Sequence, residues 1–255
     1  MNLKLSNLWA TKTKDDEWWS SFVTSPLAIV LNYFVVDIKW FTPNKITLIS
    51  FITAVIAAVF IVIGGVQNFI IAAILIHLSH VFDCMDGQIA RYRKTSSISG
   101  CYYDKLTDQI QVFIWFSAIA YAAFMQSGSV APVFLALVGI AFYSLRGYSK
   151  YVTIYLEASQ VNDSTQDDTP EEVITETAGI EFGLMANLRW FLKEQKKIFS
   201  FDEGVFIFML SLALILNMLT PMLWIFALSQ VFFGLLRAWQ RGVNLDQKLT
   251  VNIGK

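Results

Sequence analysis

Residues 83–108 read DCMDGQIARYRKTSSISGCYYDKLTD, and they place four aspartates next to segments apolar enough to cross a lipid bilayer. The surrounding chain of 255 residues is 55% hydrophobic, and only 15% of its residues are charged. Soluble domains usually carry about 25% charged residues, so this composition predicts an integral membrane protein. The formal net charge of −1 argues neither for nor against an anionic partner, and we expect no nucleic-acid partner.

Six apolar segments approach the length of about 20 residues that a membrane-spanning helix requires. They cover residues 44–65, 67–84, 108–126, 131–151, 203–219 and 221–238. The third helix is expected to start near Ser99, which places Asp104 and Asp108 in its first turns. The sequence therefore predicts an all-α, polytopic membrane protein with six transmembrane helices.

Basic residues distinguish the two ends of these helices. The turns at 64–68, 126–131 and 217–221 contain no lysine or arginine, so all 19 basic residues fall on the other side. Cytoplasmic loops are enriched in Lys and Arg, so that side, with the aspartates, is predicted to face the cytoplasm. We expect a multi-pass protein of a bacterial-type cytoplasmic membrane, with both ends inside and no cleaved signal peptide.

Two further segments are predicted to lie on the membrane surface. The apolar run LAIVLNYFVV at 27–36 is short for a span, which favours an interfacial amphipathic helix with Trp18, Trp19 and Trp40 at headgroup level. A seventh span at 17–40 is the alternative. Residues 182–199 show helical apolar spacing beside basic residues, which fits an interfacial helix or a surface helix of a small cytoplasmic lobe.

The chain therefore divides into four parts. Residues 1–43 form the cytoplasmic N-terminus and interfacial helix, and residues 44–158 form the first four membrane helices. Residues 159–200 form a cytoplasmic linker with its own interfacial helix, because their first half is acidic and poor in apolar residues. Residues 201–255 form the last two membrane helices and a cytoplasmic tail.

The spacing of the aspartates indicates a shared site. Asp83 and Asp86 are three residues apart, while Gly100, Asp104 and Asp108 repeat every four residues, so each set shares one face of its helix. Two such helices facing each other would gather four carboxylates. Placing an ionisable group inside the bilayer costs free energy, so such residues are candidates for a functional role.

Four neighbouring carboxylates cannot all stay ionised unaided, so either some are protonated or divalent cations neutralise them. Oxygen ligands suit Mg²⁺ or Mn²⁺, and two such ions would balance four negative charges. A pair of ions also supports displacement at phosphorus. Arg91 lies just beyond the small residues Gly87 and Ala90, where it could bind a phosphate.

These residues carry a family resemblance. The pattern Asp83-x-x-Asp86-Gly87-x-x-Ala90-Arg91, eight residues, then Gly100-x-x-x-Asp104-x-x-x-Asp108 resembles the signature of the CDP-alcohol phosphatidyltransferases at all eight fixed positions. The six-helix topology and the segment TPNKIT at 42–47 extend the likeness. Residues 159–200 do not belong to the common pattern.

The resemblance implies Mg²⁺-dependent displacement of CMP from a CDP-linked alcohol by the hydroxyl of a second alcohol, and a homodimer. CDP-diacylglycerol is the expected donor, and a soluble donor such as CDP-inositol, CDP-choline or CDP-ethanolamine is the alternative. By position, Asp83 and Asp104 would bridge two Mg²⁺ ions (or substituting Mn²⁺), Asp86 would bind the first, and Asp108 would bind the second and act as general base. The residues implied in donor binding are Gly87, Ala90, Arg91, Ser97, Gly100, Asn44 and Thr47.

The acceptor alcohol is less constrained by the sequence. Four basic residues, Arg146, Lys150, Arg237 and Arg241, are expected near the cytoplasmic opening and would suit a phosphorylated acceptor. They also fit a role as ordinary anchors that touch lipid phosphate, so a small polar alcohol without phosphate also remains open. His77 and His80 are expected to be packed or hydrogen-bonded rather than metal ligands.

Two other classes of protein compete with an enzyme. A cation transporter would explain the cluster of aspartates, but its ion-binding carboxylates would be expected near the middle of the bilayer. It also gives no reason for Gly87, Arg91 and Gly100 at their spacings. A catalytically silent scaffold would predict a degraded motif, whereas this motif is complete.

Overall fold

The computed structural model describes residues 3–12, 17–161, 183–195, 198, 201 and 203–253, and within these ranges the regular structure is helical. A short helix α1 (Leu3–Trp9) and a π-helical turn (Ser20–Thr24) precede α2 (Ser25–Val35). The remaining helices are α3 (Pro43–Ile63), α4 (Val66–Arg93), α5 (Ile98–Ser127), α6 (Ala131–Val161), α7 (Gly183–Glu194), α8 (Glu203–Ile215) and α9 (Leu219–Ile253). Residues 162–182, half of the predicted linker, lie outside the described ranges.

Five of the six expected spans are long apolar helices, namely α3, α4, α5, α6 and α9, which confirms a polytopic membrane fold. The remaining expected segment, 203–219, forms α8, which has only 13 residues. At 1.5 Å per residue α8 is about 20 Å long, shorter than a hydrocarbon core of about 30 Å. Its side chains Val205, Phe206 and Leu210 are buried inside the protein. Part of the apolar run there therefore packs against other helices.

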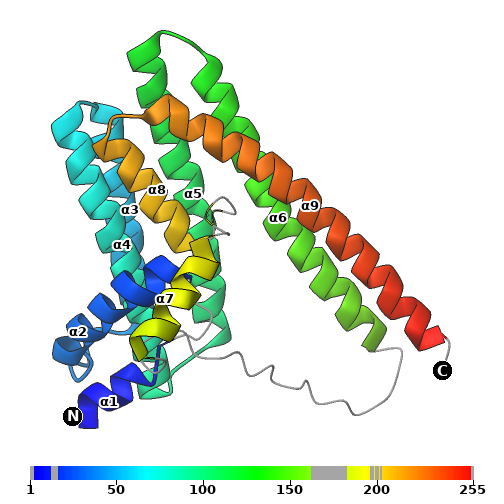
Figure 1. The fold of residues 1–255 in the computed structure, drawn as a ribbon. Helices are drawn as coiled ribbons and strands as arrows, with labels where there is room; N and C mark the ends of the chain where they lie inside the picture. Colours follow the sequence, from blue (N-terminus) through cyan, green and yellow to red (C-terminus); the bar gives the residue numbers. More distant parts are fainter. Residues whose placement is uncertain are drawn as a thin grey trace.

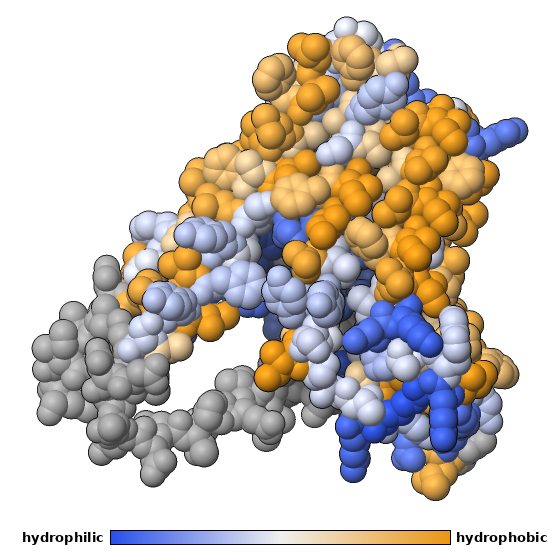
Figure 2. Space-filling view, turned by 180° about the vertical axis from the view of Figure 1, so that it is seen from behind, coloured by the Kyte–Doolittle hydropathy of each residue, from blue (hydrophilic) through white to orange (hydrophobic). Residues whose placement is uncertain are grey.

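The three turns without basic residues lie together at one end of the molecule, at the top of Figure 1. They are the α3–α4, α5–α6 and α8–α9 connections. Both termini, the end of α4 and the start of α5 lie toward the other end. Hydrophobic residues dominate the upper part of the face in Figure 2, and hydrophilic residues are concentrated in its lower part. The aspartate motif is thus near the polar end of the helices.

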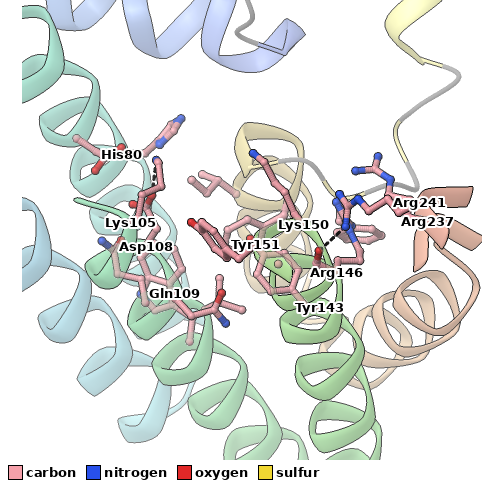
Figure 3. A pocket seen from close by; sticks show the side chains of 18 residues that line it. His80, Lys105, Asp108, Gln109, Tyr143, Arg146, Lys150, Tyr151, Arg237 and Arg241 are labelled. Carbon is pink, nitrogen blue, oxygen red and sulfur yellow. Dashed lines mark hydrogen bonds and ion pairs between the residues drawn. The ribbon is translucent and has the colours of Figure 1, made fainter. Parts of the chain in front are cut away.

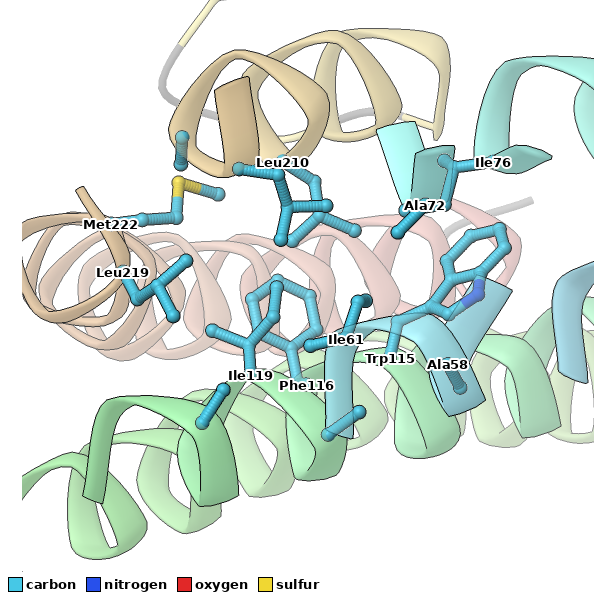
Figure 4. Packing of buried hydrophobic residues seen from close by; sticks show 14 of the residues in the cluster. Ala58, Ile61, Ala72, Ile76, Trp115, Phe116, Ile119, Leu210, Leu219 and Met222 are labelled. Carbon is cyan, nitrogen blue, oxygen red and sulfur yellow. The ribbon is translucent and has the colours of Figure 1, made fainter. Parts of the chain in front are cut away.

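Close packing of small and aromatic residues holds the membrane helices together. Helix α3 packs against both α4 and α5, α8 packs on α4, and α6 runs along α9. Figure 4 shows the interior, where Trp115 Nε1 donates a hydrogen bond to the Ala54 carbonyl at 3.0 Å. The Phe116 and Phe226 rings stack with centroids 3.7 Å apart. Lipid is as apolar as these side chains, so their close fit, rather than exclusion from water, provides the stability.

A buried amide network fastens the predicted interfacial helix to the motif helix. The Asn32 side chain of α2 donates to Gln88 Oε1 at 2.9 Å and to the Met85 carbonyl at 3.2 Å. Gln88 in turn donates to the Ser25 carbonyl at 3.1 Å. Because both amides are buried, losing either partner would leave a costly unsatisfied group. Helix α2 is therefore fixed relative to the aspartates.

The tryptophans expected at headgroup level behave differently from one another. Trp18 is buried and packs edge-to-face against Phe191 of α7 and Phe208 of α8. Trp40 is 58% exposed, and the Lys45 ammonium lies 4.6 Å from its ring centroid. Trp18 therefore contacts other protein side chains, and an aromatic side chain suits such an interior as well as a lipid interface.

Candidate active site

Three of the four motif aspartates meet between α4 and α5. Oxygens of Asp83, Asp104 and Asp108 all lie within 4.8 Å of one another. Helix α5 starts at Ile98, one residue before the expected Ser99, so Asp104 and Asp108 occupy its early turns. Ser97 caps this helix, its hydroxyl accepting a hydrogen bond from the Gly100 amide at 3.0 Å.

The fourth aspartate has a separate environment. Asp86 is only 6% exposed, and its carboxylate accepts a hydrogen bond from the Thr47 hydroxyl of α3. Thr47 also donates to the Pro43 carbonyl at 3.2 Å, so the contact lies in the first turns of α3. The spacing of three residues places Asp86 beside Asp83 on the helix surface, but turned toward α3.

The three clustered carboxylates fit a divalent cation. Their donor atoms are all oxygens, which Mg²⁺ and Mn²⁺ prefer. Two oxygens on opposite sides of a Mg²⁺ ion are about 4.2 Å apart, so atoms within 4.8 Å need little movement to share one. The Lys105 ammonium lies 3.1 Å from oxygens of both Asp104 and Asp108, and it places a positive charge at the same carboxylates.

Gly87 and Arg91 form one part of the predicted donor site. A Cβ atom at Gly87 would lie 3.1 Å from Arg91 Nη1, so the guanidinium lies close across this face of α4. Arg91 Nε donates to the Thr11 carbonyl at 2.7 Å, which fixes the orientation of the guanidinium plane. Ala90 is half-buried, and its carbonyl accepts the Thr95 amide at 2.9 Å as α4 ends.

The other part of the predicted donor site consists of Asn44, Ser97 and Gly100. A Cβ atom at Gly100 would lie 3.0 Å from Ser97 Oγ and 3.3 Å from Asn44 Oδ1, so the start of α3 closely approaches the start of α5. Asn44 lies one turn before Thr47, whose hydroxyl contacts Asp86 next to Gly87. The structure thus brings Asn44 of α3 close to Gly100 of α5, while Thr47 of α3 contacts the aspartate next to Gly87 of α4.

A cavity of about 340 Å³ connects the aspartates to the four predicted acceptor residues. Asp83 and Asp108 line one side of it. Arg146 and Lys150 of α6 and Arg237 and Arg241 of α9 line the other side, as Figure 3 shows. The four basic residues therefore share one cavity with two of the clustered carboxylates, although they are far apart in the sequence.

Two of the four basic residues also brace α6 against α9. Arg146 Nη1 donates to Gln230 Oε1 at 2.9 Å, and Gln230 is fully buried. Arg241 Nη1 donates to the Arg146 carbonyl at 2.8 Å and to the Ser149 hydroxyl. These arginines thus have structural partners in addition to their position on the cavity wall.

Several lining residues had no signal in the sequence motif. Lys105, Gln109, Gln111, Tyr143, Tyr151 and His80 all line the cavity. Helical position could have identified some of them, because Lys105 lies between two motif aspartates and His80 lies one turn before Asp83. The tyrosines could not be identified that way, since they belong to α6 and reach the cavity only through tertiary packing.

The histidines have the packed roles that the sequence predicted. His80 is buried, and its Nε2 lies 2.8 Å from the Ser20 hydroxyl. The His77 ring packs against Trp19, with ring centroids 5.3 Å apart. Neither belongs to the group of carboxylates that could hold a metal ion among the described residues.

Comparison with known proteins agrees with this geometry. Residues 40–166 match the family model described as CDP-alcohol phosphatidyltransferase, a range that includes α3, α4, α5 and all four motif aspartates. The "Bifunctional IPC transferase and DIPP synthase" of Thermococcus kodakarensis is 29% identical over 103 residues. That match covers 40% of this chain and 23% of the relative, so the chain corresponds to less than a quarter of that protein's length.

Proposed function

The chain belongs to the CDP-alcohol phosphatidyltransferase family, and we propose that it transfers the phosphatidyl group of CDP-diacylglycerol to a phosphorylated alcohol, releasing CMP. The observation that carries this proposal is the single cavity lined by Asp83 and Asp108 on one side and four basic residues on the other. The carboxylates suit the reacting diphosphate with its cations, while the basic residues suit a second, separate phosphate. Several basic side chains on one wall of the cavity suit an acceptor that already carries a phosphate.

Binding of the donor follows from the face of α4 beyond the aspartates. Gly87 lets the Arg91 guanidinium lie close to the helix backbone, where it can bind a diphosphate bidentately. Asn44, Ser97 and Gly100 supply amide, hydroxyl and backbone groups at the meeting point of α3 and α5. These polar groups are suited to the cytidine and ribose of the donor.

The four aspartates would hold two Mg²⁺ ions, which when bound supply Lewis-acid stabilisation of the diphosphate and of the leaving CMP. Asp108 is the proposed general base, because it belongs to the clustered group and also faces the cavity. The acceptor oxygen forms a bond to the phosphorus that carries diacylglycerol. The bond from that phosphorus to CMP breaks, and the hydroxyl proton moves to Asp108.

The same proposal includes an orientation and an assembly. The turns without basic residues lie at one end of the molecule, so the aspartates at the opposite end would face the cytoplasm of an inner membrane. Water-soluble acceptor and CMP could then enter and leave directly. Family membership supports a homodimer in the membrane.

The test is CMP release by the purified protein in detergent with CDP-diacylglycerol and Mg²⁺. The acceptors are glycerol 3-phosphate, inositol phosphate, inositol, serine and ethanolamine, with Asp108→Asn as control. We expect release that depends on a phosphorylated acceptor and is lost in the variant. If only CDP-inositol, CDP-choline or CDP-ethanolamine reacts, the lipid donor is wrong. If no donor gives CMP release although the protein binds metal, a transporter would be favoured.

A further inference from the structure

His80 belongs to the cavity but not to the family motif. It lies on α4 one turn before Asp83, is 5% exposed, and lines the same cavity as Asp108 (Figure 3). Within the described part of the chain, its ring makes one hydrogen bond, between Nε2 and the Ser20 hydroxyl at 2.8 Å. The second ring nitrogen, Nδ1, is therefore the one left for a ligand in the cavity.

The protonation of that second nitrogen follows from the partners of Ser20. The Ser20 hydroxyl donates its hydrogen to Glu17 Oε1 at 2.6 Å. A hydroxyl has one hydrogen, so toward His80 the Ser20 oxygen can only accept, and Nε2 must carry the proton. In a neutral imidazole, Nδ1 is then without a proton and accepts hydrogen bonds. Glu17 and Ser20 thus select the tautomer of His80.

The Glu17–Ser20 pair is held in place by α8. A Cβ atom at Gly204 would lie 1.7 Å from Glu17 Oε1 and 2.6 Å from Ser20 Oγ. Any residue larger than glycine would displace the pair, so α8 limits the space that Glu17 and Ser20 can occupy. Three segments that are distant in the sequence meet at this point, and His80 is consequently fixed in both position and tautomer.

We infer that His80 binds the acceptor alcohol, with Nδ1 accepting a hydrogen bond from one of its hydroxyl groups. This inference rests on the proposed acceptor site. The basic residues of the cavity, Lys150 among them, can only donate, and Asp108 is committed to cations and to the reacting proton. His80 therefore supplies a neutral acceptor for a hydroxyl hydrogen, which a phosphorylated alcohol requires and a bare phosphate does not.

The tautomer can be measured without any reaction, because the chain has only two histidines. Long-range ¹H–¹⁵N spectra of ¹⁵N-histidine protein in detergent micelles should show His80 with a protonated Nε2 and a bare Nδ1. His77→Gln assigns the two rings. Ser20→Ala should abolish the preference or invert it. A wild-type His80 protonated at Nδ1 would overturn the inference, whether or not the protein releases CMP.

Kinetics then test the contact with the acceptor. His80→Phe should lower kcat/KM for the acceptor about tenfold or more and leave the KM for the CDP donor unchanged, since one hydrogen bond to the acceptor is lost. Gly204→Ala should reproduce part of the loss by displacing Glu17 and Ser20, and His77→Phe is the matched control. Equal effects of His77→Phe and His80→Phe would show a packing role and contradict the inference. If the wild type releases no CMP with any acceptor, the proposed function fails, while the tautomer result still stands.

Discussion

The two sides of the cavity are built in different ways. The acidic side is lined by Asp83 and Asp108, and Asp104 lies next to them. All three come from one stretch of 26 residues, and their oxygens converge within 4.8 Å. The basic side, Arg146, Lys150, Arg237 and Arg241, comes from α6 and α9, and two of its arginines also brace these helices. The groups proposed for the chemistry are thus close in sequence, whereas the groups proposed for acceptor recognition depend on how two long helices pack.

The largest effect is expected on the acidic side. Asp83→Asn should reduce CMP release by about 1,000-fold or more, because an amide lacks the negative charge and the second oxygen with which Asp83 is proposed to bridge two cations. The elution volume and circular dichroism of the variant in detergent should stay unchanged, since Asp83 lies at the cavity rather than in the apolar core. Full activity in Asp83→Asn would refute the metal assignment.

Asp108→Asn should separate catalysis from donor binding. Loss of a general base is expected to lower turnover by about 100-fold to 10,000-fold. Binding of CDP-diacylglycerol, followed by equilibrium binding in detergent, should persist at least in part, because the proposed donor contacts lie on Arg91, Asn44 and Ser97. Equal loss of donor binding would argue against a specific role as base.

On the basic side, Lys150→Met and Arg146→Met should differ. Both should raise KM for a phosphorylated acceptor about tenfold, because each removes one charge-assisted hydrogen bond to its phosphate. Only Arg146→Met should also lower the midpoint of thermal unfolding, because it leaves the buried Gln230 without its partner. Identical unfolding midpoints, measured by intrinsic fluorescence, would contradict the bracing role.

The smallest expected effect concerns Lys105, which lies beside Asp108 on the acidic side (Figure 3). Its ammonium pairs with Asp104 and Asp108, and its side chain is 55% exposed, so the pairs contribute little free energy. Lys105→Met should tighten Mn²⁺ binding about two- to fivefold by removing a competing charge. Free Mn²⁺ measured by electron paramagnetic resonance would show this, and weaker binding in the variant would indicate that Lys105 does not compete with the metal.

The sequence predicted the parts of the molecule that local rules determine. Hydropathy identified the long helices, and the spacing of Asp104 and Asp108 identified their common face. Hydropathy did not separate apolar residues that face lipid from those that face other helices, so α8 was expected to be a full span. Nor could it place Asp86 against Thr47, His80 against Ser20 or Gln230 against Arg146. Each of those pairs joins helices whose relative rotation is set by packing.

The most direct test is the preference for a phosphorylated acceptor, measured as the ratio of kcat/KM for inositol phosphate over inositol and for glycerol 3-phosphate over glycerol. The ratio is compared between the wild type and Lys150→Met with CDP-diacylglycerol and Mg²⁺. We predict that the wild type strongly prefers a phosphorylated acceptor and that the preference falls about tenfold in Lys150→Met. A wild type that prefers the alcohols without phosphate, or a preference that Lys150→Met leaves intact, would contradict the proposal that this cavity joins the catalytic carboxylates to a phosphate-binding acceptor site.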